Sequence, residues 1–143
     1  MTRPNPFDFT GRHVFVAGGS SGINLGIADG FAECGAHVAI ASRSAERVAG
    51  AVEQLRRHGG QVEGYSADVR EPEAIEAALR SAHERFGPID VLVSGAAGNF
   101  VAAALGMSPK GFKTVVDIDL LGGFNVVRAA HPYLRKPGAA VLN

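Results

Sequence analysis

The fold is decided by one segment, His13-Val14-Phe15-Val16-Ala17-Gly18-Gly19-Ser20-Ser21-Gly22-Ile23. Its first five residues form a short run rich in apolar side chains, which predicts a buried strand. Glycines and serines follow at once, and the apolar positions Ile23, Ile27 and Phe31 then recur at helical spacing. A glycine-rich turn between a strand and a helix lets the backbone approach phosphate oxygens, which the free N–H groups of the helix start can bind. The segment therefore predicts a phosphate-binding turn, and a tight turn that binds nothing is the alternative. The expected binding residues are Gly18, Ser20, Ser21, Gly22 and Ile23.

The rest of the chain repeats this alternation of strand and helix. Further strands are predicted at 37–41, 61–66, 91–93 and 139–142, and a long helix is predicted from Ser108-Pro109 towards Leu134. Five apolar strands separated by helices favour an α/β fold, a doubly wound parallel sheet of the Rossmann type. Because no helix follows the fifth strand, we expect residues 1–143 to be the N-terminal part of a single dinucleotide-binding domain, truncated after that strand. A natural small domain is the alternative.

Composition excludes several classes of protein. The 14 Lys and Arg residues balance the 14 Asp and Glu residues, so no net field attracts nucleic acid or an anionic membrane. No apolar run approaches the roughly 20 residues of a membrane span, and residues 1–6 lack the apolar core of a signal peptide. The single cysteine, Cys34, favours a reducing compartment, and we expect a cytoplasmic protein. The histidines show no metal-ligand spacing, so no metal site is predicted.

The end of the second predicted strand indicates which dinucleotide would bind. Proteins that bind NAD usually carry Asp or Glu about there, where it accepts hydrogen bonds from the ribose hydroxyl groups. This chain has Ser42, Arg43 and Ser44 instead, with Arg47 one helical turn later. Guanidinium and hydroxyl groups can bind a 2′-phosphate, which a carboxylate would repel. The predicted cofactor is therefore NADP(H), and a solvent-exposed Arg43 without a ligand is the alternative.

Two further segments follow predicted strands at the same edge of the sheet. Asp68 and Val69 come after the third strand, where a short polar side chain can reach an adenine amino group. Ala96 and Gly98 come after the fourth strand, where small residues let the chain pass close to a ribose. Asp119 interrupts an apolar stretch, where an unpaired charge would be costly, although a merely exposed acid is the alternative.

These motifs, in this order, resemble those of the short-chain dehydrogenase/reductase family. Residues 18–23 resemble its TGxxxGIG motif, with Ala17 in place of the threonine and Asn24 in place of the last glycine, and residues 94–98 resemble its NNAG segment. The resemblance runs from about Phe9 to the last residue. It implies a nicotinamide cofactor, a small-molecule substrate and, at full length, a homo-oligomer, commonly a tetramer. The Tyr-x-x-x-Lys pair and the catalytic serine of the family have no match, so the chain alone is predicted not to turn over.

One branch of that family shares more with this chain. Residues 96–100 and 111–119 are similar to the peroxisomal type of 2,4-dienoyl-CoA reductase, which carries aspartate where most members have asparagine. The resemblance implies that Asp119, together with a later lysine, positions a water as proton donor, and that Arg70 and Phe100 contact an acyl-CoA substrate. It implies NADPH-dependent reduction of 2,4-dienoyl-CoA thioesters, an auxiliary reaction of fatty acid β-oxidation. The alternatives are a generic carbonyl or alcohol oxidoreductase of the same fold and a non-catalytic nucleotide-binding module.

Overall fold

Five parallel strands form one sheet in a computed structural model that describes residues 7–143, so residues 1–6 of the predicted domain lie outside the described part. The strand order is β3-β2-β1-β4-β5. The order reverses between β1 and β4, and ligands of open α/β sheets bind at such a reversal, beyond the carboxyl ends of the strands. The predicted doubly wound α/β fold is confirmed. The strands are β1 His13–Ala17, β2 His37–Ser42, β3 Val62–Ser66, β4 Val91–Ser94 and β5 Ala140–Leu142.

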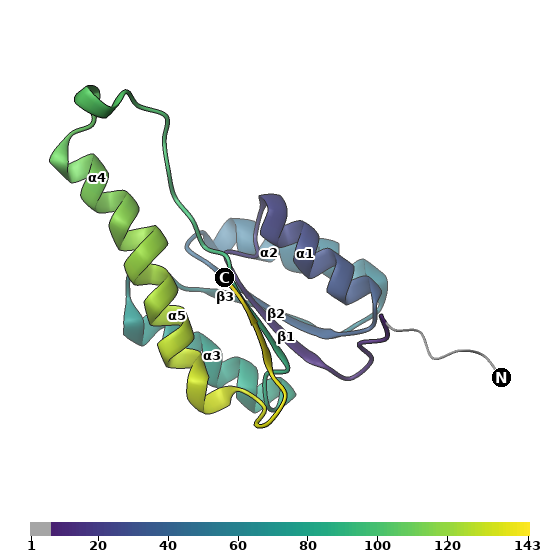
Figure 1. Cartoon of the computed structure of the whole chain (residues 1–143). Coiled ribbons are helices and arrows are strands. Elements are labelled where there is room, and N and C mark those ends of the chain that lie inside the picture. The colour runs from purple at the N-terminus through teal and green to yellow at the C-terminus, as the bar shows by residue number, and fades with distance from the viewer. Residues whose placement is uncertain (1–6) are drawn as a thin grey trace.

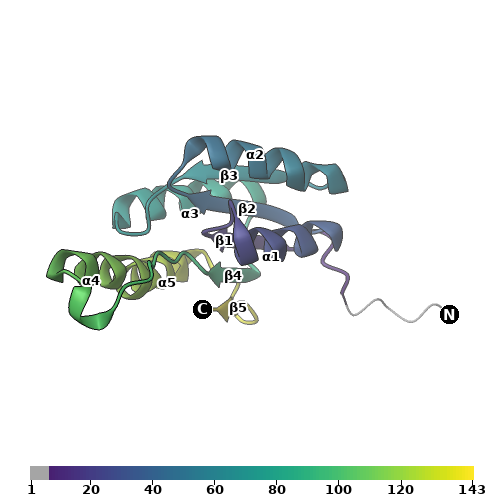
Figure 2. The ribbon, with the colours of Figure 1, turned by 90° about the horizontal axis from the view of Figure 1, so that it is seen from above.

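Helices cover both faces of the sheet (Figures 1 and 2). On one face lie α1 (Gly22–Glu33) and α2 (Ala45–Leu55), and on the other α3 (Pro72–Phe86) and α5 (Gly122–Ala130). Successive side chains of a strand point to opposite faces, so each strand contributes to two cores. In β1, Val14 and Val16 pack with α1 and α2, whereas Phe15 and Ala17 pack with α3 and α5. Burial on both faces explains why the strands read as nearly continuous apolar runs.

The amino-terminal edge of the sheet is held by Asp90. Its carboxylate accepts hydrogen bonds from the backbone N–H of His13 at 2.9 Å, from Arg12 Nη1 at 3.0 Å and from Arg135 Nε at 2.5 Å. Asp90 directly precedes β4, and His13 begins β1. These bonds fix β1 and β4 beside each other at this end of the sheet, which sets where the opposite, carboxyl ends of the two strands lie.

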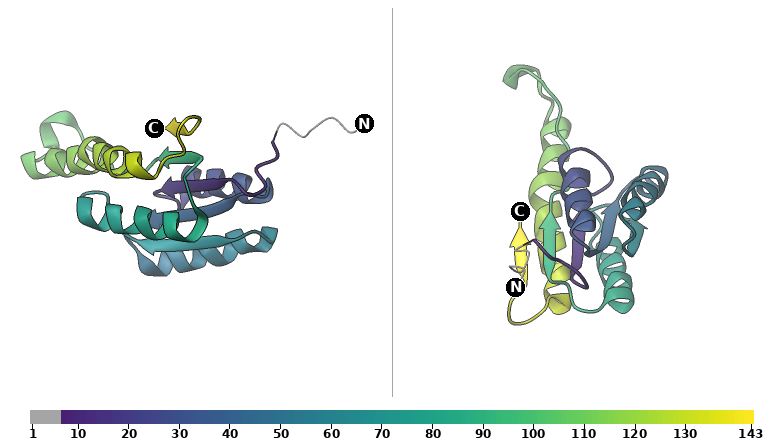
Figure 3. Two further views of the ribbon diagram at one scale, coloured as in Figure 1. Left: turned by 90° about the horizontal axis from the view of Figure 1, so that it is seen from below. Right: turned by 90° about the vertical axis from the view of Figure 1, so that its right-hand side faces the viewer.

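The long helix predicted after Ser108 begins as expected but is not a single α-helix. Ser108 Oγ accepts a hydrogen bond from Gly111 N at 3.0 Å and caps α4, Pro109–Val115. A π-helical segment, Val116–Leu121, then joins α4 to α5, and a 3-10 turn, His131–Tyr133, ends the helix. Together with the loop after β4, α4 extends beyond the carboxyl ends of the strands (Figure 3). The π-helical segment carries Asp119, and an apolar periodicity read at 3.6 residues per turn does not reveal it.

Candidate functional site

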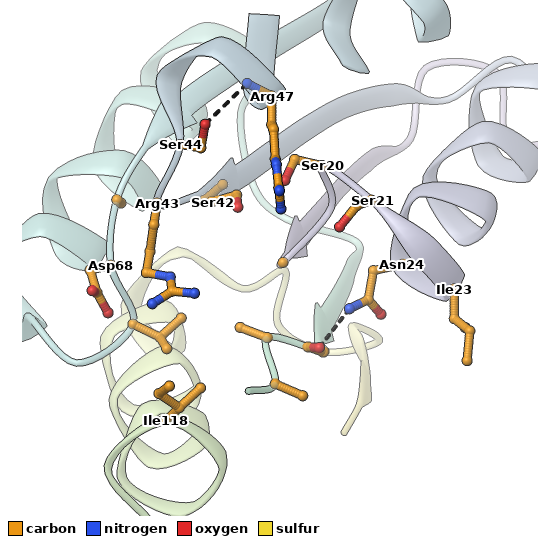
Figure 4. Close-up of a pocket in the computed structure, with 17 residues that line it drawn as sticks. Ser20, Ser21, Ile23, Asn24, Ser42, Arg43, Ser44, Arg47, Asp68 and Ile118 are labelled. Carbon is orange, nitrogen blue, oxygen red and sulfur yellow. Dashed lines mark hydrogen bonds between the residues drawn. The ribbon is translucent and has the colours of Figure 1, made fainter. Parts of the chain in front are cut away.

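A cavity of about 680 Å³ lies beyond the carboxyl ends of β1, β2, β3 and β4 (Figure 4). It therefore occupies the position that the reversal of strand order predicts for a ligand. All the residues that sequence reasoning assigned to the cofactor line this cavity, except Gly22 and Gly98. The lining residues are Gly18, Ser20, Ser21, Ile23, Asn24, Ala41, Ser42, Arg43, Ser44, Arg47, Ala67, Asp68, Val69, Gly95, Ala96, Ala97 and Ile118.

The turn between β1 and α1 has the geometry of a phosphate cradle. Gly18 has a φ of +81°, and a Cβ added there would lie 2.8 Å from the Cα of Ala96, so only glycine fits. Ser21 caps α1 without any side-chain hydrogen bond, and the first bond of the helix runs from Leu25 N to Ser21 O. The N–H groups of the first turn are therefore left for a ligand, and they carry the positive end of the helix dipole. These features fit a pyrophosphate group.

Ile23 belongs to this turn but does not anchor α1 in the core. Its side chain is 84 % exposed, whereas Ala28 and Ala32 are the buried residues of the helix. Small side chains let α1 pack closely on the sheet. The apolar spacing of Ile23, Ile27 and Phe31 therefore indicated a helix correctly without marking its most buried face.

Two arginines line the end of the cavity beside β2. The guanidinium groups of Arg43 and Arg47 point into it (Figure 4). Neither group forms an ion pair or a side-chain hydrogen bond with any residue of the described part, 7–143. Ser44 caps α2, its Oγ accepting a hydrogen bond from Arg47 N at 3.3 Å. Two unpaired cations beside hydroxyl groups form a site suited to an anion such as a phosphate.

Asp68 lines the neighbouring part of the cavity and is already bound by Arg70. Nη2 of Arg70 lies 2.6 Å from Oδ2 of Asp68, and its Nε lies 3.0 Å from Oδ1. The hydrogen bonds from Arg70 lower the pKa of Asp68 against the opposing effect of burial, so the carboxyl stays ionised and accepts hydrogen bonds only. An ionised carboxylate keeps lone pairs that could accept a bond from an adenine amino group.

The two residues expected to contact substrate do not line the cavity. Arg70 binds Asp68 from outside it, and Phe100, which is 49 % exposed, lies in the loop after β4 near Gly111. The structure thus brings together the predicted cofactor residues but does not bring Arg70 and Phe100 into the same space. Their contact with a substrate stays a prediction.

Asp119 lies beside the cavity, on the π-helical segment. Its Oδ1 accepts a hydrogen bond from the backbone N–H of Gly98 at 2.8 Å, and the residue is exposed. Asp119 is therefore exposed, as in the alternative interpretation, and its carboxylate is not unpaired. Its neighbour Asp117 faces another group, Lys113 Nζ at 2.6 Å. The proton-donor role predicted for Asp119 remains untested.

Sequence reasoning missed Ile118, which is 8 % exposed and reaches the cavity from the π-helical segment. A Cβ on Gly98 would lie 2.7 Å from Ile118 Cδ1, so this glycine admits the isoleucine rather than lining the cavity itself. Only the position of Ile118 next to Asp119 could have indicated it. Within residues 7–143, no group of three or more His, Cys, Asp or Glu side chains could hold a metal, and no helix is long and apolar enough to cross a membrane.

Comparison with known proteins adds independent findings. The family model described as short chain dehydrogenase matches residues 12–143. A protein of Arabidopsis thaliana named peroxisomal 2,4-dienoyl-CoA reductase is 43 % identical over 126 residues, which cover 88 % of this chain and 42 % of the relative. The Rattus norvegicus protein of the same name is 44 % identical over 132 residues, which cover 91 % and 45 %. The chain thus spans a little under half the length of these relatives.

Solved structures agree on the fold. A putative short-chain alcohol dehydrogenase from Sinorhizobium meliloti matches with a TM-score of 0.88 at 33 % identity, over 96 % of this chain and 55 % of that one. An alcohol dehydrogenase from Thermococcus sibiricus, solved as a complex with 5-hydroxy-NADP, matches with a TM-score of 0.84 at 28 % identity, over 91 % and 57 %.

Proposed function

The chain belongs to the short chain dehydrogenase family, and on that premise we propose that it forms the cofactor-binding part of an NADPH-dependent reductase. The family uses nicotinamide cofactors. The cavity at the reversal of strand order between β1 and β4 would hold the cofactor, which supplies a hydride when bound. The N–H groups at the start of α1 would bind the pyrophosphate, and Asp68 would accept from the adenine amino group.

The choice of NADPH rests on one observation, the pair of unpaired guanidinium groups of Arg43 and Arg47 inside the cavity. A carboxylate in their place would accept bonds from the ribose hydroxyls of NADH and repel a 2′-phosphate. Asp68 is the one acid among the described lining residues, and Arg70 offsets its charge through a bidentate ion pair. The two guanidinium groups favour the doubly charged 2′-phosphate of NADPH, and the ion pair lessens the repulsion that Asp68 would exert on it.

Titration of the chain with each cofactor tests this choice. Wild type should bind NADPH more tightly than NADH. Arg43→Ala should weaken NADPH about tenfold to a hundredfold, the value of a hydrogen bond to a charged group, and leave NADH nearly unchanged. Arg57→Ala is the matched control, because Arg57 is exposed in the 3-10 turn at the opposite end of α2 and carries the same charge. Equal losses of the two cofactors in Arg43→Ala would contradict the assignment.

We propose further that the natural protein reduces 2,4-dienoyl-CoA thioesters. The names of the relatives from Arabidopsis thaliana and Rattus norvegicus support this substrate, together with an aspartate at position 119. Oδ1 of Asp119 is bound by Gly98 N, whereas Oδ2 has no hydrogen-bond partner within residues 7–143. The free oxygen would hold the water that delivers a proton. Arg70 and Phe100 would contact the acyl-CoA.

The test of the substrate uses the protein at its full natural length. NADPH oxidation should be observed with 2,4-hexadienoyl-CoA and should be slow with simple ketones. The opposite result would reject the acyl-CoA substrate and favour a generic carbonyl or alcohol oxidoreductase. Cofactor binding without any turnover would favour a non-catalytic nucleotide-binding module.

Two expectations about the whole protein remain proposals. The cytoplasmic location predicted from the sequence has no support from the relatives, whose names are peroxisomal. A homo-oligomer is supported by exposed apolar side chains along the α4–α5 helix, namely Phe112, Leu120, Leu121 and Phe124. Sedimentation at full natural length tests it, with a tetramer as the expected result.

A further inference from the structure

One side chain joins the turn between β1 and α1 to the loop after β4, where the strand order reverses. Asn24 lies in the first turn of α1, and its Nδ2 donates a hydrogen bond of 2.5 Å to the carbonyl oxygen of Gly95, in the loop after β4 (Figure 4). The bond joins residues 71 positions apart in the chain and is partly buried. Asn24 and Gly95 both line the cavity.

The backbone around this bond is packed so closely that the spacing of the two loops is fixed. A Cβ on Gly95 would lie 2.2 Å from Oδ1 of Asn24, and a Cβ on Gly18 would lie 3.1 Å from its Nδ2. The amide is therefore held between two glycines, one from each loop. A shorter side chain at position 24 would leave the carbonyl of Gly95 without this donor and the gap between the loops unfilled.

The residues that line the cavity fall into two groups, one near the bond between Asn24 and Gly95 and one away from it. Arg43, Arg47 and Asp68 follow β2 and β3, away from the loops that Asn24 joins. A dinucleotide whose phosphates lie on the start of α1 extends one half towards those residues and its other half towards the β4 loop. Only the half that extends towards the β4 loop would contact the segment that Asn24 holds in place.

We propose that Asn24 is a positioning residue, which ties the phosphate turn to the β4 loop before the cofactor arrives and so favours the nicotinamide half of the dinucleotide. This inference rests on the proposed function. The ordering of the two loops is completed before binding, and a site ordered in advance binds more tightly than one that must be ordered by its ligand. The adenine half gains nothing from the bond.

The test measures by calorimetry how the chain binds two ligands. NADPH is the whole dinucleotide, and adenosine 2′,5′-bisphosphate represents its adenine half alone. Asn24→Leu keeps most of the volume and removes the donor, and Asn24→Ala removes both. Each variant should bind NADPH about threefold to tenfold more weakly than wild type, the loss expected for one hydrogen bond, and bind the bisphosphate within about twofold of wild type. A loss of stability alone would weaken both ligands equally.

Asn125→Leu is the matched control, because Asn125 Nδ2 donates a similar bond, 2.9 Å long, to the carbonyl of Val69 on the adenine side. Its effect should not be larger for NADPH than for the bisphosphate. Equal weakening of the two ligands in both Asn24 variants would overturn the inference, as would tighter binding of NADPH, which would make Asn24 an obstacle. Failure of wild type to bind either ligand would instead refute the proposed function on which the inference rests.

Discussion

Replacement of Gly18 by alanine should cost free energy of unfolding in two ways, through backbone strain and through a clash with the β4 loop. Replacement of Gly22 by alanine should cost strain alone and so allows the two to be separated. Both glycines have positive φ, +81° at Gly18 and +59° at Gly22. A Cβ at Gly22 meets no atom within 4 Å, whereas a Cβ at Gly18 would lie 2.8 Å from Cα and 2.9 Å from N of Ala96. Gly22→Ala therefore carries conformational strain alone, and Gly18→Ala adds a clash with the backbone of the β4 loop.

The expected magnitudes follow from this geometry. An L-residue in the left-handed region costs about 1–2 kcal/mol, which applies to both variants. The clash adds about 1–3 kcal/mol at Gly18, because backbone atoms cannot swing away as the end of a side chain does. Gly18→Ala should thus lower the free energy of unfolding by about 2–5 kcal/mol and Gly22→Ala by about 1–2 kcal/mol. The gain from a less flexible unfolded chain is the same for both and cancels in their difference.

Urea unfolding of wild type and both variants, followed by circular dichroism, measures these free energies. NADPH titration of Gly18→Ala should also show weaker binding, because the displaced β4 loop widens the crevice that the cofactor crosses. Equal destabilisation by the two substitutions would refute the close approach of the β1–α1 turn to Ala96, and with it the fixed spacing on which the role of Asn24 depends.

Two other predictions concern charge. His13 is 1 % exposed, with Nδ1 2.8 Å from Gly87 O and no partner for Nε2 among the described residues, and burial lowers the pKa of its ring. The unfolded chain therefore binds the proton more readily than the folded chain. Below a pH of about 6.5, the free energy of unfolding of wild type should fall more steeply than that of His13→Asn, by up to about 1.4 kcal/mol per pH unit. Urea unfolding measured across pH tests this, and parallel profiles of the two proteins would contradict it. At full natural length, Asp119→Asn should retain the bond to Gly98 N and NADPH affinity yet lose about a hundredfold or more in turnover of 2,4-hexadienoyl-CoA, measured from NADPH oxidation. Unchanged turnover would exclude a role for the charge.

The parts of the fold that sequence predicted best are those specified by neighbours in the chain. The strand from His13 to Ala17 has the predicted bounds, and α4 begins after Ser108 as predicted. The turn after β1 could be placed beside the cavity because glycines between a strand and a helix are typical of phosphate-binding turns. Arg43 could be placed there because the position after β2 is fixed by the sheet.

The parts that sequence did not predict depend on contacts between distant segments. The bond from Asn24 to Gly95 O spans 71 residues, and the sequence showed only that Asn24 stands in place of the last glycine of the motif. Ile118 reaches the cavity from the π-helical segment, which no spacing in the sequence indicates. Neither arrangement leaves a periodic pattern, since each is set by how two loops or a loop and a helix meet.

This difference also explains why the cofactor half of the proposal is stronger than the substrate half. Arg43 directly follows β2, and Asp68 lies two residues after the end of β3. The ends of these strands are held by the hydrogen bonds of the sheet and by two buried cores. Phe100 and Asp119 lie on an exposed loop and an exposed helical surface, which are joined by the bond from Gly98 N to Asp119 and by the close packing of Ile118 on Gly98. A substrate site encloses its ligand from more than one side, and Phe100 and Asp119 could contact a ligand from one side. The cofactor preference can therefore be tested on this chain, whereas the role of Asp119 requires the natural protein.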